Sequence, residues 1–485
     1  MAAGIFTIKP KFQSDVVCTL GESTTVKYYV LSSTVDWKEQ ERVKINYVSG
    51  GTGGSASGEQ RGLANATFSM VVFGTDQADA MAQLRILSRA LTNKHGGFIQ
   101  YRPRGLGASV LSTYYHYLQS PLPAIRSQGD ISDYKGLIGQ IDRTHTYGIE
   151  CKCTVAIKAW ATSDPTTPVT IKAATSIENF TDDSNVNYVV VENSAIKGDG
   201  FIPIIEYSRT DAIDCFVYAL WAQFHKMTVG NTDVLDFVDS DEFDPAMTNV
   251  VDATVCGGEY ERTTDPVDAT LITPTHWTGI DQMYFGKVSP IACVKTSGSY
   301  TLGIEYYQSS TGEYVSAGTK ATTNANWALY PFNQIDFPIA SPPDYIANGE
   351  ADDWLGFSYV RLGITRVSAG NFDIDFVWIP RSDEWLAKLY SLDNDSASHS
   401  MDTDDEITID AFSGMVYRGQ PVTAKSFLST WNKDGPSLHM LVFEKGFDHR
   451  ISFLALDEDE TYRHGFTADV TVYGLHATIY PFEEA

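Results

Sequence analysis

The sequence contains 485 residues, with 35 Lys and Arg against 61 Asp and Glu, so its formal net charge is −26. A chain of this length exceeds one ordinary hydrophobic core, and we expect two to four domains. The 43% apolar and 20% charged residues are typical of a globular protein and argue against wholesale disorder. A surface this negative repels phosphate, which argues against stable binding of DNA or RNA.

The residue types favour strands over helices. The chain has 26 Tyr, 24 Phe and 9 Trp, which are enriched in strands. Its six cysteines are few for this length and do not indicate a disulfide framework. Residues 1–6 lack a basic region and a long apolar run, so we expect no signal peptide. No apolar run reaches the length that spans a bilayer, so we expect no membrane insertion.

The clearest local pattern lies in residues 67–104, which predict a strand, a helix and a second strand. A strand-like run ends at Gly74, and Thr75 or Asp76 is placed to cap the helix that follows. We expect this helix over residues 75–95. Its apolar stripe is predicted from spacings of three and four residues and consists of Ala80, Leu84, Leu87 and Leu91.

A Gly-rich segment, residues 49–62, lies between predicted strands. It is interpreted as a flexible hairpin tip, as a phosphate cradle, or as an arm that orders only against a neighbouring subunit. The phosphate cradle is disfavoured because the segment lacks a Gly-Lys-Ser/Thr ending and leads into a strand. The candidate subunit contacts in the arm are Gly50, Gly51, Thr52, Gly53, Gly54 and Ser55.

Residues 127–135 resemble a loop, and residues 149–161 form the best predicted strand. In that strand Ile149, Cys151, Cys153 and Val155 alternate with polar residues, so they are expected to face a core. Turn-forming residues at 163–168 mark a domain boundary. The first predicted domain is therefore residues 1–165.

The rest of the chain is predicted to be mainly β as well. Short aromatic-rich runs between turn signals indicate a two-sheet sandwich or jelly roll over residues 170–382. Within it, residues 213–224 are ambiguous between strand and helix, and we favour strand. Residues 384–390 are predicted as a short helix at the start of a C-terminal β segment, residues 383–485. This segment either returns to the first domain or forms another small β domain.

Acidic residues concentrate at 233–244, 402–406 and 457–460. Carboxylates of this kind can hold a hard cation such as calcium, but none of the three has the twelve-residue loop with a central glycine, which favours solvated loops. None of the ten histidines stands in a metal-ligand or nucleophile pattern. We therefore predict no metal site, no cofactor, no catalytic residue and no enzymatic activity.

Exposed aromatic side chains on a sandwich can stack on sugar rings. The candidate glycan-facing residues are Trp277, Trp327 and Trp354. Burial of the same residues in a core is the alternative interpretation.

Two stretches resemble a known family. The strand leading into the helix, followed by residues 96–103 (GGFIQYRP), is similar to the tube-forming domain of siphophage tail proteins, the distal tail protein in particular. Residues 372–380 (FDIDFVWIP), followed by Asp383 and Glu384, resemble the strand that ends an inserted sandwich in tail proteins. About 100 residues follow that strand here, whereas many distal tail proteins end there, and this departs from the family pattern.

The resemblance implies a tube-forming β-sandwich with one flanking helix, plus a jelly-roll-like sandwich that points outwards. It implies a virion structural protein of the tail tip or baseplate, made in the host cytoplasm. This protein would form a ring, a hexamer, which joins the tail tube protein to the hub or fibre proteins that attach to the host. DNA would pass through the channel without specific binding, and the acidic balance of the chain would suit the channel wall.

Two other functions stay open. One is a tail tube protein that carries a decoration domain. The other is a carbohydrate-binding module or a glycan-active enzyme, which would work as an isolated monomer.

Overall fold

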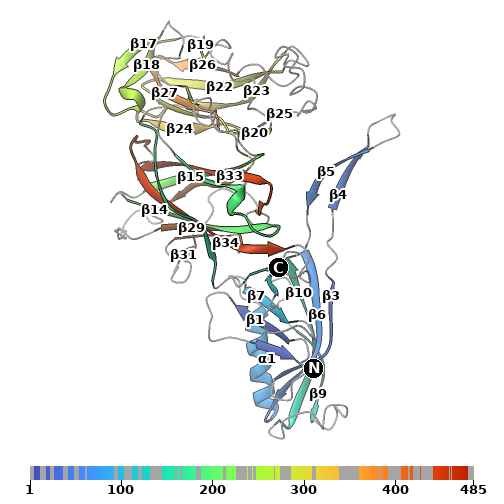
Figure 1. Cartoon of the computed structure of the whole chain (residues 1–485). Coiled ribbons are helices and arrows are strands. Elements are labelled where there is room, and N and C mark those ends of the chain that lie inside the picture. Colours follow the sequence, from blue (N-terminus) through green and yellow to red (C-terminus); the bar gives the residue numbers. More distant parts are fainter. Residues whose placement is uncertain are drawn as a thin grey trace.

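The computed structural model describes residues 5–10, 18–21, 27–36, 42–47, 54–60, 63–91, 97–102, 112–117, 123–130, 145–158, 161–163, 167–181, 187–210, 215–225, 237–238, 243, 247–266, 268–272, 286–308, 313–337, 360–380, 382, 384–391, 406–412, 415–418, 426–427, 441–457, 459 and 461–478. The protein is mainly β, as predicted, and consists of three parts in a row (Figure 1). We call them the N-terminal unit (residues 5–162), the middle sandwich and the outer sandwich. The last two are defined by their strands below.

The N-terminal unit is one curved sheet with a helix on one face. The sheet runs in the order β8-β7-β1-β2-β3-β6-β10-β9, and β8 also pairs with β10. Its strands are β1 (Ile5–Pro10), β2 (Cys18–Gly21), β3 (Tyr28–Asp36), β6 (Leu63–Gly74), β7 (Gly97–Arg102), β8 (Ser112–Tyr117), β9 (Ala124–Asp130) and β10 (Tyr147–Lys158). The predicted inward residues of β10, from Ile149 to Val155, are buried in the core under the helix.

The helix α1 (Gln77–Leu91) forms where the sequence predicts it, and residues 92–95 of the predicted span lie outside the described residues. Asp76 caps it: its Oδ1 accepts the N–H of Asp79 at 2.8 Å, and Asp79 Oδ2 accepts the N–H of Thr75 at 3.0 Å. This reciprocal arrangement satisfies N–H groups that have no partner within the helix. The predicted apolar stripe, from Ala80 to Leu91, is buried against β6 and β10.

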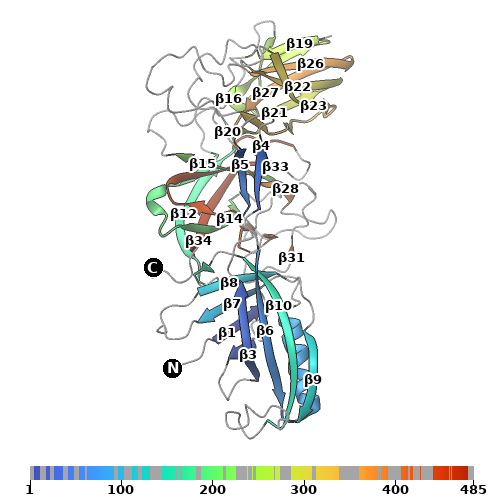
Figure 2. The same ribbon diagram turned by 90° about the vertical axis from the view of Figure 1, so that its right-hand side faces the viewer.

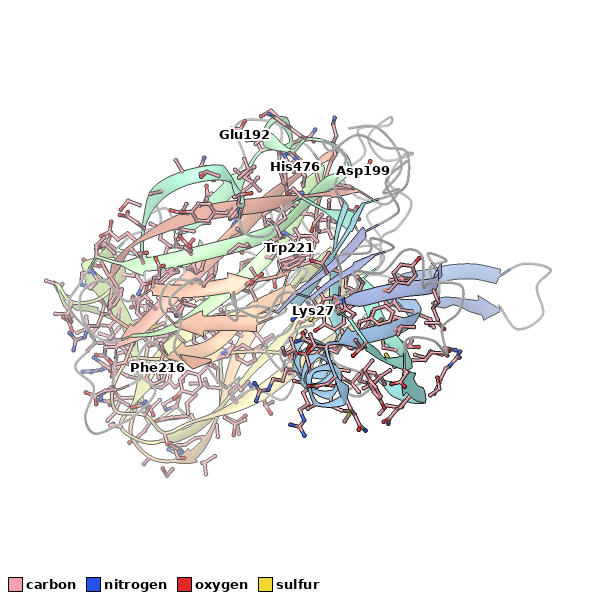
Figure 3. All side chains as sticks on the ribbon, turned by 90° about the horizontal axis from the view of Figure 1, so that it is seen from below. Lys27, Glu192, Asp199, Phe216, Trp221 and His476 are labelled. Atoms are coloured by element: carbon pink, nitrogen blue, oxygen red, sulfur yellow. The ribbon has the colours of Figure 1, made fainter. Side chains whose placement is uncertain are left out.

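The strands β4 (Arg42–Tyr47) and β5 (Gly54–Gln60) form an antiparallel hairpin of their own. Among the described residues they pair with each other and with no other strand. The hairpin extends away from the N-terminal unit and stands beside the middle sandwich without joining it (Figures 1 and 3). The predicted Gly-rich loop is therefore shorter than residues 49–62, because residues 54–60 are a strand.

The middle sandwich combines two distant parts of the chain. One layer continues the sheet of the N-terminal unit through β11 (Ala161–Thr162). It contains β12 (Val169–Glu178), β14 (Gly200–Arg209), β29 (Glu406–Asp410), β30 (Met415–Arg418), β31 (Ser426–Phe427), β32 (Phe443–Glu444) and β34 (Thr467–Thr478). The other layer contains β13 (Tyr188–Val191), β15 (Cys215–His225), β28 (Glu384–Ser391) and β33 (Phe447–Asp457).

The outer sandwich is inserted between β15 and β28. Its inner layer contains β16 (Phe237–Val238), β17 (Thr248–Val251), β18 (Glu259–Thr264), β21 (Ile291–Thr296), β24 (Ala328–Pro331) and β27 (Asn371–Trp378). Its outer layer contains β19 (Asp268–Ile272), β22 (Ser299–Gln308), β23 (Glu313–Thr322) and β26 (Val360–Ser368). The short pair β20 (Gly286–Val288) and β25 (Ile335–Phe337) completes the part of the chain that is described.

Three apolar cores hold the four layers together. One core fills the middle sandwich, for example with Tyr207 and Phe453, and another fills the outer sandwich with Tyr300 and Phe372. A third core lies between the two sandwiches, where Phe376 of β27 packs near Leu454 of β33. Side chains alternate along β15 and β33, so each strand contributes to both of the cores that it borders.

The joint between the N-terminal unit and the middle sandwich is hydrogen-bonded. Residues of β11 pair with Ala477 and Thr478 at the end of β34, and β11 also pairs with β8 (Figure 2). The N–H of Ser163 donates to the carbonyl of His476 at 2.9 Å, and Ser163 Oγ accepts the N–H of His476 at 3.0 Å. The end of the predicted C-terminal segment, residues 383–485, thus pairs with β11 of the N-terminal unit. The other described strands of that segment belong to the middle sandwich.

Three sequence-based expectations need correction. The segments 170–382 and 383–485 share the sheets of the middle sandwich, so strand pairing does not separate them at residue 382. Residues 384–390 are strand β28 and not a helix, because pairing with β15 satisfies their backbone and overrides local helix preference. The predicted loop at 127–135 begins inside strand β9. By contrast, the preference for strand at 213–224 is confirmed by β15.

Candidate assembly surfaces

The edge strand β9 is the first surface with unused bonding capacity. Among the described residues it pairs on one side only, with β10. Six of its seven residues are exposed and the seventh is half-buried, and the side chains of Arg126 and Ser127 contact Glu150 of β10. An edge strand presents a row of N–H and C=O groups that can pair with another chain.

The hairpin β4–β5 is the second surface. Of the six predicted contact residues, Gly54 and Ser55 begin β5, opposite Tyr47 and Asn46 of β4. Gly50, Gly51, Thr52 and Gly53 lie outside the described residues. A two-stranded hairpin without further packing is marginally stable in water, so this element is suited to docking on another surface.

Among the described residues, the candidate glycan-facing aromatics do not form an exposed surface for stacking on sugar rings. Trp327 is 8% exposed in the core between the sandwiches, which contradicts the expectation that its ring faces outward. Its ring meets that of Tyr260 edge-on at 5.2 Å, and Lys295 Nζ lies 4.3 Å from its centroid. Trp277 and Trp354 lie outside the described residues.

The acidic clusters are described only in part. Asp457 is buried, and its carboxylate accepts the N–H groups of Asp459 and Thr461 and pairs with Arg463 Nε at 2.7 Å. Its oxygens therefore hold the loop that follows β33. Residues 233–236, 239–242, 244 and 402–405 lie outside the described residues. In the part of the chain that is described, no group of three or more His, Cys, Asp and Glu side chains is arranged to hold a metal ion.

A second buried carboxylate was not singled out from the sequence. Asp373 on β27 is buried and accepts hydrogen bonds from Nε and Nη2 of Arg262 on β18, at 2.7 and 2.8 Å. Lys295 Nζ on β21 lies 3.9 Å from the same carboxylate. The alternation of apolar and acidic residues in FDIDFVW signals a strand, but it does not reveal that the acidic side chains face a core.

The net charge is distributed very unevenly along the chain. Residues 1–162 contain 17 Lys and Arg against 12 Asp and Glu, whereas residues 163–485 contain 18 against 49. The N-terminal unit is therefore basic by five charges, and the remainder is acidic by 31. The acidic surplus thus lies outside the unit predicted to form the ring, so the net charge of the whole chain does not by itself support the expectation of an acidic channel wall.

Comparison with known proteins gives only distant likenesses. No protein-family model matches the sequence, and no curated protein matches it. Among solved structures, the chain is similar to the Dit (gp 19.1) protein of phage SPP1, described as a hub adsorption apparatus, with 10% identity, a TM-score of 0.20 and coverage of 73% of this chain and 94% of that one. A chain of the phage p2 baseplate in its activated conformation gives 8% identity, a TM-score of 0.20 and coverage of 79% and 99%.

A third likeness involves only part of the chain. The CBM22-1 and GH10 modules of a Clostridium thermocellum xylanase give 15% identity and a TM-score of 0.20, over 30% of this chain and 26% of that one. At these scores none of the likenesses defines a family. Among the described residues, no helix is long and apolar enough to cross a bilayer.

Proposed function

We propose that this chain is a structural component of a phage-like tail tip. It assembles as a ring, a hexamer, that connects the tail tube to the host-recognition apparatus. The N-terminal unit builds the ring, and the two sandwiches project from it towards fibres or the cell surface. The role is structural and not catalytic.

The observation that carries this proposal is the hairpin β4–β5. It extends from the N-terminal unit and pairs with no other described strand. Folding a hairpin costs conformational entropy that two strands alone barely offset, so its stability is best explained by contact with a neighbouring subunit. The open edge of β9 supports the same interpretation, because it can extend the sheet of the unit into the next copy.

The buried carboxylates support a structural role. Asp373 and Asp457 are each held by an arginine inside the chain, and both lie in or beside the core that joins the two sandwiches. The first pair joins two neighbouring strands of one layer, β18 and β27, and the second holds the loop that follows β33, so both carboxylates are used to stabilise the fold. The burial of Trp327 removes one support of the carbohydrate-binding alternative.

The proposal is tested by removing the hairpin from the full chain. Residues 43–59 are replaced with a short Gly-Ser linker, and the mass of the assembly is measured by light scattering. We expect an unchanged melting temperature, because no other described strand pairs with the hairpin, together with loss of the ring. The matched control changes a different hairpin: residues 309–312, which connect β22 and β23, are replaced with Asn-Gly. We expect this variant to assemble like the wild type. A truncated chain that assembles like the wild type would oppose the proposal.

A further inference from the structure

Two buried serines lie at the corner where the chain leaves the outer sandwich. Ser289 comes just before β21, and Ser382 lies between β27 and β28. Both residues are 0% exposed, and among the described residues neither Oγ atom has a hydrogen-bond partner. Buried polar atoms nearly always have a partner, because leaving one without a partner costs free energy. These two hydroxyls therefore call for a partner that the described protein groups do not supply.

The backbone brings the two serines to the same corner. The N–H of Ser289 donates to the carbonyl of Pro380 at 3.0 Å, which continues the pairing of β21 with β27. Ser382 follows Pro380 by two residues, so their Cα atoms are at most about 7 Å apart. Nε2 of Gln334 donates to the carbonyl of Ser382 at 2.5 Å and holds this residue against the segment that follows β24. Three segments of the outer sandwich thus converge around the serines.

Three prolines interrupt the supply of backbone donors at this corner. Pro290 comes just before β21, Pro331 ends β24 opposite the first residue of β21, and Pro380 lies just past β27. Proline has no backbone N–H to donate. The carbonyl of Pro290 accepts the N–H of Phe332 at 2.9 Å, but a carbonyl oxygen has two lone pairs and can accept a second hydrogen bond. The corner therefore offers acceptors that a further donor can use.

We propose that a single buried water molecule binds at this corner, held by Ser289 Oγ and Ser382 Oγ. Water can donate two hydrogen bonds and accept two, so it matches hydroxyl groups, which do both, and carbonyl groups, which only accept. Buried waters typically make about three hydrogen bonds to polar groups that have no other partner. This inference goes beyond the proposed function and does not depend on it.

The water ties the outer sandwich to the segment that leaves it. Ser382 lies between β27, which belongs to the outer sandwich, and β28, which belongs to the middle sandwich. The neighbouring strands β20 and β24 lie on the side of the outer sandwich that faces the middle sandwich (Figure 1). A water bound to both serines connects the start of β21 with this crossing segment, so it helps to fix the position of the crossing.

The test uses the sign of the change in stability when each hydroxyl is removed. Ser289→Ala and Ser382→Ala are compared with the wild type by thermal unfolding of the full chain. A buried hydroxyl without a partner destabilises the fold, so its removal would raise the melting temperature. A hydroxyl that holds a water stabilises the fold, so its removal lowers the melting temperature. We expect each variant to melt lower, by on the order of 2 °C.

A control variant calibrates the sign. Ser452 is 2% exposed, and its Oγ accepts a hydrogen bond from Arg450 Nε at 3.0 Å. Ser452→Ala removes a buried hydroxyl whose partner is known, and it is expected to lower the melting temperature in the same way.

The double variant Ser289→Ala/Ser382→Ala tests whether one water serves both serines. Once the first substitution has removed one of the two hydroxyls that hold the water, the second has less to disrupt. The loss in the double variant is therefore expected to be smaller than the sum of the two single losses. Additive losses would show that the two hydroxyls do not share a ligand.

A crystal structure of the full chain at high resolution is the direct measurement. It is expected to show an ordered water oxygen about 2.5–3.0 Å from both Oγ atoms. Three results would overturn the inference: a higher melting temperature in either single variant, additive losses in the double variant, and serine hydroxyls that bond to protein groups in the crystal structure without a shared water.

Discussion

The guanidinium of Arg262 grips the carboxylate of Asp373 through two hydrogen bonds, one from Nε at 2.7 Å and one from Nη2 at 2.8 Å. The Asp373 side chain is only 4% exposed, whereas the Arg262 side chain is 33% exposed. The pair therefore fixes a buried charge at the inner layer of the outer sandwich, beside the core that joins the two sandwiches. Two strands, β18 and β27, are locked together by it.

Arg262→Ala is expected to destabilise the chain strongly. Among the described residues it leaves the buried carboxylate with the longer contact to Lys295, and breaking a buried pair from one side costs about 3 kcal/mol or more. Arg126→Ala is the matched control: it breaks a longer, exposed contact with Glu150 and is expected to cost less than about 1 kcal/mol. Urea unfolding measures both, and equal losses would contradict the assignment.

Gly74→Ala tests the turn between β6 and α1. A Cβ at this position would lie 2.2 Å from the backbone nitrogen of Ala80, so the first turn of the helix must shift. We expect a loss of about 2–3 kcal/mol in the free energy of unfolding. At Gly303 the nearest atom to an added Cβ is Thr319 Cγ2, at 3.6 Å, so Gly303→Ala is expected to be tolerated. A tolerated Gly74→Ala would show that the turn is looser than described.

Trp327→Ala tests whether this ring is structural. It removes a large side chain from the core between the sandwiches, and we expect a loss of about 3–5 kcal/mol. Trp327→Phe keeps part of the packing and is expected to cost less. The measurement is thermal unfolding, with glycan-array binding as a second readout. Lost glycan binding with unchanged stability would restore the glycan-facing interpretation.

His449 predicts an acid-sensitive middle sandwich. Burial lowers the pKa of this histidine from its ordinary value of 6.5 to about 4, while a hydrogen bond with the carbonyl of Glu444 and the charge of Asp448 act in the opposite direction. Its ring stacks on Phe443 at 4.6 Å and lies parallel to Trp221, labelled in Figure 3, at 6.0 Å. Protonation would place a charge among these rings.

The sign of the effect follows from the two pKa values. Between about pH 6.5 and pH 4 this histidine is protonated in the unfolded chain but neutral in the folded chain. The free energy of unfolding therefore decreases as the pH is lowered through this window, by about 3 kcal/mol in total. His449→Phe keeps the stack and removes the titration. The difference in unfolding free energy between wild type and variant should therefore vary with pH between 4 and 6.5 and be constant above it. A constant difference at every pH would contradict this account.

The elements that the sequence predicted best are those whose pattern is local. The cap at Asp76, the apolar stripe of α1 and the alternation around Cys151 each depend on spacing within one element, and all three are confirmed. The edge strand β9 escaped prediction because its residues are exposed or half-buried and mostly polar, and its apolar residues Ala124 and Ile125 are adjacent, so no apolar alternation marks it.

Contacts between residues far apart in the sequence could not be predicted, for a different reason. The sequence shows Trp327 as an aromatic residue between turns, but its burial depends on a second sandwich that packs against its layer. Likewise β28 lies far along the chain from β15, its partner, and its residues favour a helix when considered alone. The two candidate assembly surfaces differ in this respect. The resemblance indicated an arm at residues 49–62, whereas the open edge of β9 is visible only from the order of the strands in the sheet.

The measurement that tests the central claim most directly is the native mass of the purified full chain by light scattering, followed by electron microscopy of the largest species. The account predicts rings of defined subunit number with an open channel. A mass of 53.5 kDa, that of a single chain, at every concentration and with no rings in the micrographs would contradict it.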